Sequence, residues 1–235
     1  MGIHMEMTRR TLAVLLLLAA VLVASCGTLT GSPPDRAQPG DAASRGTPCE
    51  GTGDDFPGDV KLARCLTEWF WSQRFQESGG AYRPITRFVA YRGADGPDCG
   101  GQAAVPENAF YCPYGHFIAY DAVWLKAMYD QMGDGAVYVV IPHELGHAVQ
   151  AQLVEDFGFN VQRELQADCY AGAALSGLIR VGALNAEQGD EEELLTNLQA
   201  AGDPTDVWWA PDAHGTPQQR QGHFAHGYTE GVGTC

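Results

Sequence analysis

Two histidines four residues apart, with a glutamate between them, constrain the fold of this chain more than any other feature of its sequence. They are His143 and His147 in the stretch His-Glu-Leu-Gly-His. On an α-helix, side chains four residues apart lie on the same face, so both imidazoles can reach one metal ion. The side chain of Glu144 projects about 100° further round the helix, where it can hold and deprotonate a metal-bound water. The alternative is a solvated helix face that binds no metal.

The predicted third ligand is a carboxylate from a later helix. A catalytic zinc site of this type takes two histidines and one glutamate from the protein and leaves its fourth position to water. Glu155 and Asp156 are too distant if the helix continues, about 12 Å along it for Glu155. Glu164 follows the segment 158–160, a break after which a second helix could run back beside the first. Asp168 lies one turn later and could accept a hydrogen bond from the first histidine, which would orient its ring. Both acids could instead belong to a solvated acidic stripe.

The chain resembles the putative neutral zinc metallopeptidases, a gluzincin-type group, in His-Glu-x-Gly-His-x-x-Gln and in the later Glu-Leu-Gln-Ala-Asp-Cys-Tyr-Ala-Gly. The segments 108–113 and 214–220 extend the resemblance over about residues 60–235. It implies an α+β fold that is mainly helical and zincin-like, with an active-site helix, an adjacent helix that carries the glutamate, and a small sheet. It also implies the site: zinc (Zn²⁺) ligands at His143, His147 and Glu164, a general base at Glu144, and a ligand-orienting residue at Asp168.

Periodicity and turn signals predict the other elements. Apolar spacing and β-branched or aromatic runs indicate helices at 59–77, 121–132 and 185–200 and strands at 85–91, 109–112 and 116–120. The last two strands could form a hairpin, and a Thr-Pro pair at 216–217 is typical of the start of a final helix.

Two details of these elements bear on the site. Pro142 stands directly before the first histidine, and proline is comfortable only in the first turn of a helix. We therefore expect the active-site helix either to begin near Ile141 or to be kinked there. We also expect the strand at 116–120 to lie at the edge of the sheet, where it could pair with an extended substrate backbone. The alternative is an ordinary sheet strand.

A short apolar segment near the start of the chain is typical of an export signal. Arg9 and Arg10 precede the apolar run 12–24, which is too short to span a bilayer. The sequence Val-Ala-Ser-Cys, ending at Cys26, resembles a bacterial lipobox, which implies that residues 1–25 are a lipoprotein signal peptide and that Cys26 carries lipid. An ordinary secretory signal cleaved nearby is the alternative. We therefore expect a lipid-anchored protein on the extracytoplasmic face of the cell membrane.

Composition separates a predicted tether from one folded domain. Residues 26–58 are rich in Gly, Pro, Ser, Thr, Ala and Asp and poor in apolar side chains, which predicts a flexible tether. Residues 59–235 are the predicted zincin-like metallopeptidase domain, whose length needs only one core. The chain has 14 Lys and Arg against 29 Asp and Glu, and its net charge of −15 argues against nucleic-acid binding. The sequence does not indicate an oligomeric state.

Cysteine usage agrees with export. The chain has 7 cysteines, and six remain if Cys26 carries lipid, an even number suited to an oxidising compartment. Six cysteines allow fifteen pairings. Order along the chain favours three pairs: Cys49 with Cys65, Cys99 with Cys112, and Cys169 with Cys235. The alternative role of metal ligand for Cys169 is disfavoured, because that residue is rotated away from the helix face of Glu164.

The activity that these residues favour is zinc-dependent hydrolysis of a peptide or protein substrate, with Glu144 activating the water. A further donor usually stabilises the oxyanion, and the sequence leaves four candidates open: His214, His223, His226 and Tyr228. The alternatives are a zinc hydrolase of another amide or ester, a catalytically silent zincin-fold lipoprotein that acts as a binding or assembly module, and a purely structural metal.

Overall fold

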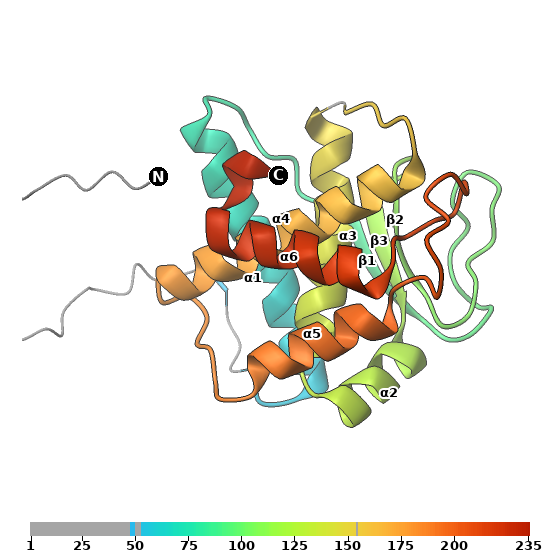
Figure 1. The fold of residues 1–235 in the computed structure, drawn as a ribbon, viewed down its shortest axis with the longest axis horizontal. Helices are drawn as coiled ribbons and strands as arrows, with labels where there is room; N and C mark the ends of the chain where they lie inside the picture. Colours follow the sequence, from blue (N-terminus) through green and yellow to red (C-terminus); the bar gives the residue numbers. More distant parts are fainter. Residues whose placement is uncertain (1–47, 50–52, 154) are drawn as a thin grey trace, which may run out of the picture. The chain divides into compact units, whose positions relative to one another are not determined.

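The computed structural model describes residues 48–49, 53–153 and 155–235 (Figure 1). The predicted signal peptide, Cys26 and most of the predicted tether lie outside these residues. The described residues form the following elements in chain order: α1 Phe56–Glu77, β1 Arg87–Tyr91, β2 Ala109–Cys112, β3 Phe117–Asp121, α2 Ala122–Met132, α3 Gly135–Leu153, α4 Asn160–Arg180, α5 Asp190–Ala200, α6 Pro217–Glu230 and the 3₁₀-helix η1 Val232–Thr234. The predicted fold class, mainly helical with a small sheet and consistent with a zincin-like fold, is confirmed. In this part of the chain, no helix has the length and apolar character needed to cross a membrane.

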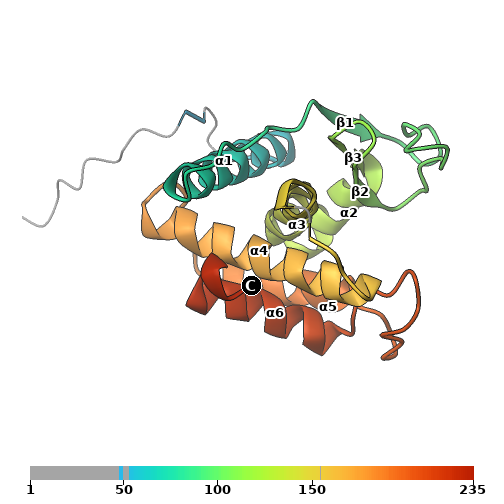
Figure 2. The same cartoon turned by 90° about the horizontal axis from the view of Figure 1, so that it is seen from above.

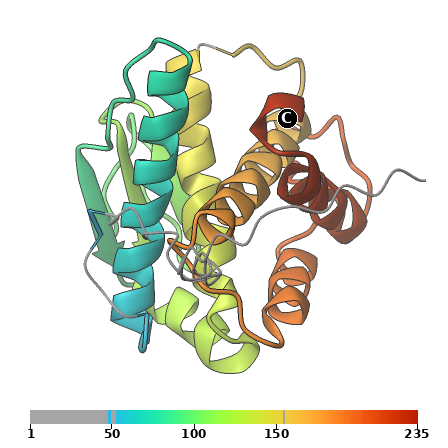
Figure 3. The ribbon, with the colours of Figure 1, turned by 90° about the vertical axis from the view of Figure 1, so that its left-hand side faces the viewer.

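Helix α1 begins at Phe56, somewhat earlier than the predicted 59. The side chain of Asp55 accepts a hydrogen bond from the backbone N–H of Gly58 at 2.8 Å, and Pro57 occupies the first turn, so the start of the helix is well capped. The helix buries Leu62, Leu66 and Phe70 against α3 and α4. Figure 3 shows α1 and α3 side by side. Helix α1 therefore forms one wall of the core around α3, the helix that carries His143 and His147.

The sheet has the order β1-β3-β2, with β1 parallel and β2 antiparallel to β3. The predicted hairpin of β2 and β3 is confirmed. The prediction that the second of these strands lies at the edge is wrong, because β1 pairs with it on the other side and makes it the central strand. Among the described residues, β2 pairs with β3 alone, so β2 offers the free edge next to α3.

Helix α3 is the central helix of the core, and most of its residues are buried. Figure 2 shows it nearly end-on, with the sheet, α1 and α4 around it. It begins at Gly135, so of the two alternatives expected from Pro142 the start near Ile141 is wrong, and Pro142 lies in the helix interior. Proline at this position removes the N–H that would bond the carbonyl of Tyr138. The close packing on all sides explains why the helix tolerates this loss.

Helices α4 and α6 pack at close range because glycines stand at their contact. A Cβ at Gly172 would lie 2.1 Å from the carbonyl oxygen of Phe224, and one at Gly227 would lie 1.9 Å from that of Cys169. Neither side chain could be accommodated without separating the helices. This contact packs α6 against α4, the helix that carries Glu164.

Helix α5 covers only Asp190–Ala200, so the helix predicted at 185–200 starts too early. The chain breaks at Gly189, whose φ of 114° lies in the left-handed region that favours glycine. The four acidic residues 190–193 then fill the first turn, where the positive end of the helix dipole stabilises them.

Candidate metal centre

Three predicted ligands meet between α3 and α4. Nε2 of His143 is 3.1 Å, and Nε2 of His147 is 3.4 Å, from Oε2 of Glu164. One ligand atom from each of the three residues lies within 4.8 Å of the others. Tetrahedral zinc with bonds of ~2.0–2.2 Å holds its ligand atoms ~3.3–3.6 Å apart. The donor set and its spacing therefore fit a zinc ion.

Gly146, between the two histidines, permits this meeting. A Cβ at position 146 would lie 3.1 Å from the carbonyl oxygen and 3.2 Å from Cα of Ala167. These are backbone atoms of α4, which cannot give way without moving the helix. The absence of a side chain at Gly146 thus lets α4 approach until Glu164 reaches both imidazoles.

His143 is held from behind by a buried ion pair. Its Nδ1 is 2.7 Å from Oδ1 of Asp168, a fully buried carboxylate on α4. Arg220 on α6 donates to both oxygens of that carboxylate, from Nε at 2.8 Å and from Nη2 at 2.7 Å. Nη1 of Arg220 donates to the carbonyl of Ala201 at 2.8 Å. The acceptor at Nδ1 leaves Nε2 of His143 to face the ligand cluster, as the sequence predicted for Asp168.

His147 is held by a neutral group. Its Nδ1 is 2.8 Å from Oε1 of Gln150, one turn further along α3. The other end of this amide donates to the carbonyl of Arg163 at 2.8 Å and to Oε1 of Gln166 at 2.9 Å. Only 4% of Gln150 is exposed, so its hydrogen bonds replace those to water.

Burial and neighbouring charge act in opposite directions on the pKa values of these groups. Burial disfavours charge on His143, but the carboxylates of Asp168 and Glu164 outweigh it and raise the pKa of His143 to about 10. Burial likewise disfavours ionised Glu164, yet the two histidines hold the pKa of Glu164 well below its usual value. The pKa of Asp168 is also lowered, because Arg220 and His143 outweigh its burial. These shifts keep both carboxylates ionised, as metal binding requires, whereas binding of a metal would have to release the proton that His143 holds on Nε2.

A cavity of about 740 Å³ opens onto the cluster. Its walls include the residue proposed as general base, Glu144, which is 7% exposed, and the chain along β2 from Glu107 to Tyr111. Of the four candidate oxyanion donors, His214 lines this cavity. His223 and His226 are exposed on α6, and Tyr228 packs against the hydrophobic core.

Other candidates are placed away from the ligand position. The carboxylate of Glu155 accepts a hydrogen bond from the hydroxyl of Tyr170 at 3.1 Å, and Asp156 follows it beyond the end of α3. Cys169 forms a disulfide with Cys235, so the alternative that made it a metal ligand is wrong. All three predicted disulfides are present: Cys49–Cys65, Cys99–Cys112 and Cys169–Cys235.

Sequence reasoning gave no role to Arg220 or Gln150. Gln150 could have been found, because it stands three residues after His147 and therefore on the same helix face. Arg220 is separated from Asp168 by fifty-two residues, and no local pattern links the two.

The chain is similar to a described protein family and to several known proteins. The model of the family described as "Putative neutral zinc metallopeptidase" matches residues 6–235. "Uncharacterized protein YpfJ" of Escherichia coli (strain K12) is 33% identical over 248 residues, which cover 92% of this chain and 83% of that protein. "Uncharacterized protein Rv2575" of Mycobacterium tuberculosis is 28% identical over 185 residues, which cover 65% of this chain and 61% of that protein. No solved structure matches.

Proposed function

This chain belongs to the family described as "Putative neutral zinc metallopeptidase", and from that premise we propose that it hydrolyses peptide bonds with the help of zinc. The observation that carries the proposal is the meeting of two imidazoles and one carboxylate at zinc-like spacing beside a buried glutamate, at the wall of an open cavity. Three protein ligands leave a fourth position for water, which is the arrangement of catalytic zinc sites.

His143, His147 and Glu164 would hold the zinc. When bound, zinc supplies a Lewis acid that polarises the scissile carbonyl and lowers the pKa of water towards ~7. Glu144 takes the proton of the attacking water as general base and later passes it to the leaving amine. Its position in the cavity wall, buried beside the ligand cluster, supports this role.

Two further groups of the cavity wall are assigned within the same proposal. His214 donates a hydrogen bond to the developing oxyanion, and its ring lies near Asp203, with Nδ1 3.6 Å from Oδ1. The free edge of β2 pairs with the extended backbone of a peptide or protein substrate, in place of the strand that the sequence favoured.

The variant Glu144→Gln tests the reaction. It should still bind zinc but lose hydrolysis of a peptide library by about 10²–10⁴-fold, the usual contribution of a general base. Glu107→Gln is the matched control, because Glu107 is an exposed acid on the same cavity wall. Unchanged hydrolysis in Glu144→Gln would refute the assignment of the base. Stoichiometric zinc without cleavage of any peptide or ester by the wild type would favour the alternative, a catalytically silent binding or assembly module.

We also propose that the chain is a lipoprotein anchored through Cys26 on the extracytoplasmic face of the cell membrane. The support is the lipobox-like sequence that ends at Cys26, together with six further cysteines that pair as an oxidising compartment allows. Cys26→Ser should move the protein from the membrane fraction to the soluble fraction of cells. Retention of this variant in the membrane fraction would contradict the lipid anchor.

A further inference from the structure

We propose that Gln150 is a positioning residue for the metal ligand His147, and that Gln166 and the disulfide-bonded segment 231–235 hold Gln150 in place from behind. The inference depends on the proposed function only in taking His147 as a zinc ligand. It does not require that the protein cleave peptides.

The direction of each hydrogen bond in this network follows from two backbone carbonyls, which can only accept. The side-chain atom of Gln150 that lies 2.8 Å from the carbonyl of Arg163 must be a donor, and it is therefore the amide nitrogen Nε2. Oε1 of Gln150 must then face His147, and it can only accept, so Nδ1 of His147 carries the proton. The Nε2 lone pair of His147 is thereby left for the metal, which lies on the side of Glu164.

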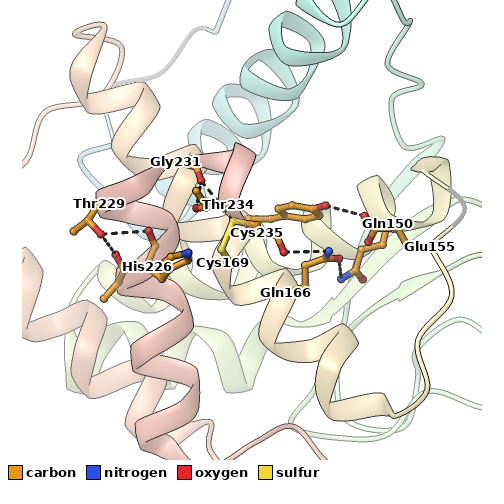
Figure 4. The surroundings of a disulfide bond; sticks show 11 residues. Gln150, Glu155, Gln166, Cys169, His226, Thr229, Gly231, Thr234 and Cys235 are labelled. Carbon is orange, nitrogen blue, oxygen red and sulfur yellow. Dashed lines mark hydrogen bonds between the residues drawn. A yellow bond between two sulfur atoms is a disulfide. The ribbon is translucent and has the colours of Figure 1, made fainter.

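The same reasoning extends the network to the end of the described chain. Nε2 of Gln166 donates to the backbone oxygen of Cys235 at 3.4 Å, so Oε1 of Gln166 accepts from Nε2 of Gln150 at 2.9 Å. Figure 4 shows the contacts of Gln166 with Gln150 and with Cys235, beside the Cys169–Cys235 disulfide. The disulfide joins the segment 231–235 to α4, next to the turn that carries Gln166.

The two histidines therefore have unequal supports. His143 donates to a carboxylate that Arg220 neutralises, whereas His147 depends on a neutral amide. Without Gln150, the ring of His147 could turn or carry its proton on Nε2, and neither form binds metal through that atom. Loss of such a partner of a ligand histidine typically weakens metal binding about 10–100-fold.

Zinc affinity, measured by competition with a chromophoric chelator, tests the proposal without any assay of hydrolysis. Gln150→Met keeps the length of the side chain and removes both of its hydrogen-bonding groups, so the Kd for zinc should rise about 10–100-fold. Gln152→Met is the matched control, because Gln152 lies on the same helix but bonds the N–H of Arg83 and the carbonyl of Ala148. Its Kd for zinc should stay within about two-fold of the wild type.

A double-mutant cycle distinguishes positioning from general destabilisation. Gln166→Met should raise the Kd for zinc less than Gln150→Met does, and it should have no further effect once Gln150 is replaced. Replacing Cys169 and Cys235 by Ser should act in the same way. Replacing Cys49 and Cys65 by Ser should lower the melting temperature without changing the Kd for zinc.

Several outcomes would overturn the proposal. One is a folded Gln150→Met variant whose Kd for zinc equals that of the wild type. Another is a Gln166→Met change or a Cys169–Cys235 replacement whose effect on the Kd for zinc simply adds to that of Gln150→Met. If Gln150→Met does not fold, Gln166→Met and the two disulfide replacements carry the test alone, since Gln166 is only partly buried. A protein that shows the coupled zinc affinities and cleaves nothing would retain this inference and refute the proposed function.

Discussion

Replacing Arg220 by methionine should destabilise the protein severely, because it leaves a buried carboxylate without its main counter-charge. Arg220 is 5% exposed and Asp168 is fully buried. Their guanidinium and carboxylate groups share two hydrogen bonds of 2.7 and 2.8 Å, and a third joins Arg220 to the carbonyl of Ala201. Methionine fills much of the same space but supplies none of these three bonds.

The magnitude follows from the burial of both partners. Removing one member of a buried ion pair typically costs ~3–5 kcal/mol, since the remaining charge stays desolvated. The net stability of a domain is only ~5–15 kcal/mol. At ~2–4 °C for each kcal/mol in a domain of this size, the melting temperature should fall by about 6–20 °C. The double variant Asp168→Asn with Arg220→Met removes both charges, so it should be more stable than Arg220→Met alone.

Chemical denaturation of the chelator-treated proteins measures these differences without a contribution from metal. Arg74→Met is the control, because Arg74 pairs with Glu77 at the surface, with side chains 40% and 59% exposed. Its loss should cost less than about 1 kcal/mol. A cost below about 1 kcal/mol for Arg220→Met, or a double variant no more stable than the single one, would refute the reasoning.

Three further predictions concern packing, pH and metal. Gly146→Ala should cost about 1–3 kcal/mol and weaken zinc binding, because the new Cβ presses on the backbone of Ala167, whereas Gly222→Ala on α6 meets open space and should be neutral or stabilising. Burial, reinforced by neighbouring carboxylates, raises the pKa of Asp134 to about 6. The native state therefore holds this proton more tightly than the unfolded state, and its contribution to stability falls as pH rises from about 4 to 6. Asp134→Asn should then stabilise the protein by about 1 kcal/mol near neutral pH, after allowance for solvent screening, and by less near pH 4, as melting curves at the two pH values would reveal. Zinc at 100 times its Kd should add ~2.7 kcal/mol to the free energy of unfolding, and an excess of chelator should remove that increment in a thermal melt.

The meeting of the three candidate ligands could be predicted from the sequence because their geometry is local. His143 and His147 share a helix face by their spacing, and a glycine-containing break precedes the helix that carries Glu164. The disulfides followed from chain order. Each of these inferences needs only a few neighbouring residues or a simple count.

The features that the sequence did not reveal depend on contacts between distant segments. The sheet edge was misassigned because β1 adds to β3 in parallel from far earlier in the chain. The interior position of Pro142 reflects packing around α3 that overrides a local helix preference. The pairing of Arg220 with Asp168 needs α6 to lie on α4, and nothing near either residue indicates that contact.

The supports of the two histidines come from segments that are synthesised last. A growing chain contains His143, His147 and Glu164 well before it contains Arg220 or Cys235. The ligands therefore exist for a time without the groups that orient them, and the centre gains its final geometry only when α6 docks on α4. We therefore expect the proposed zinc to bind late in the maturation of the molecule, after α6 has docked on α4, and not as soon as α3 has formed.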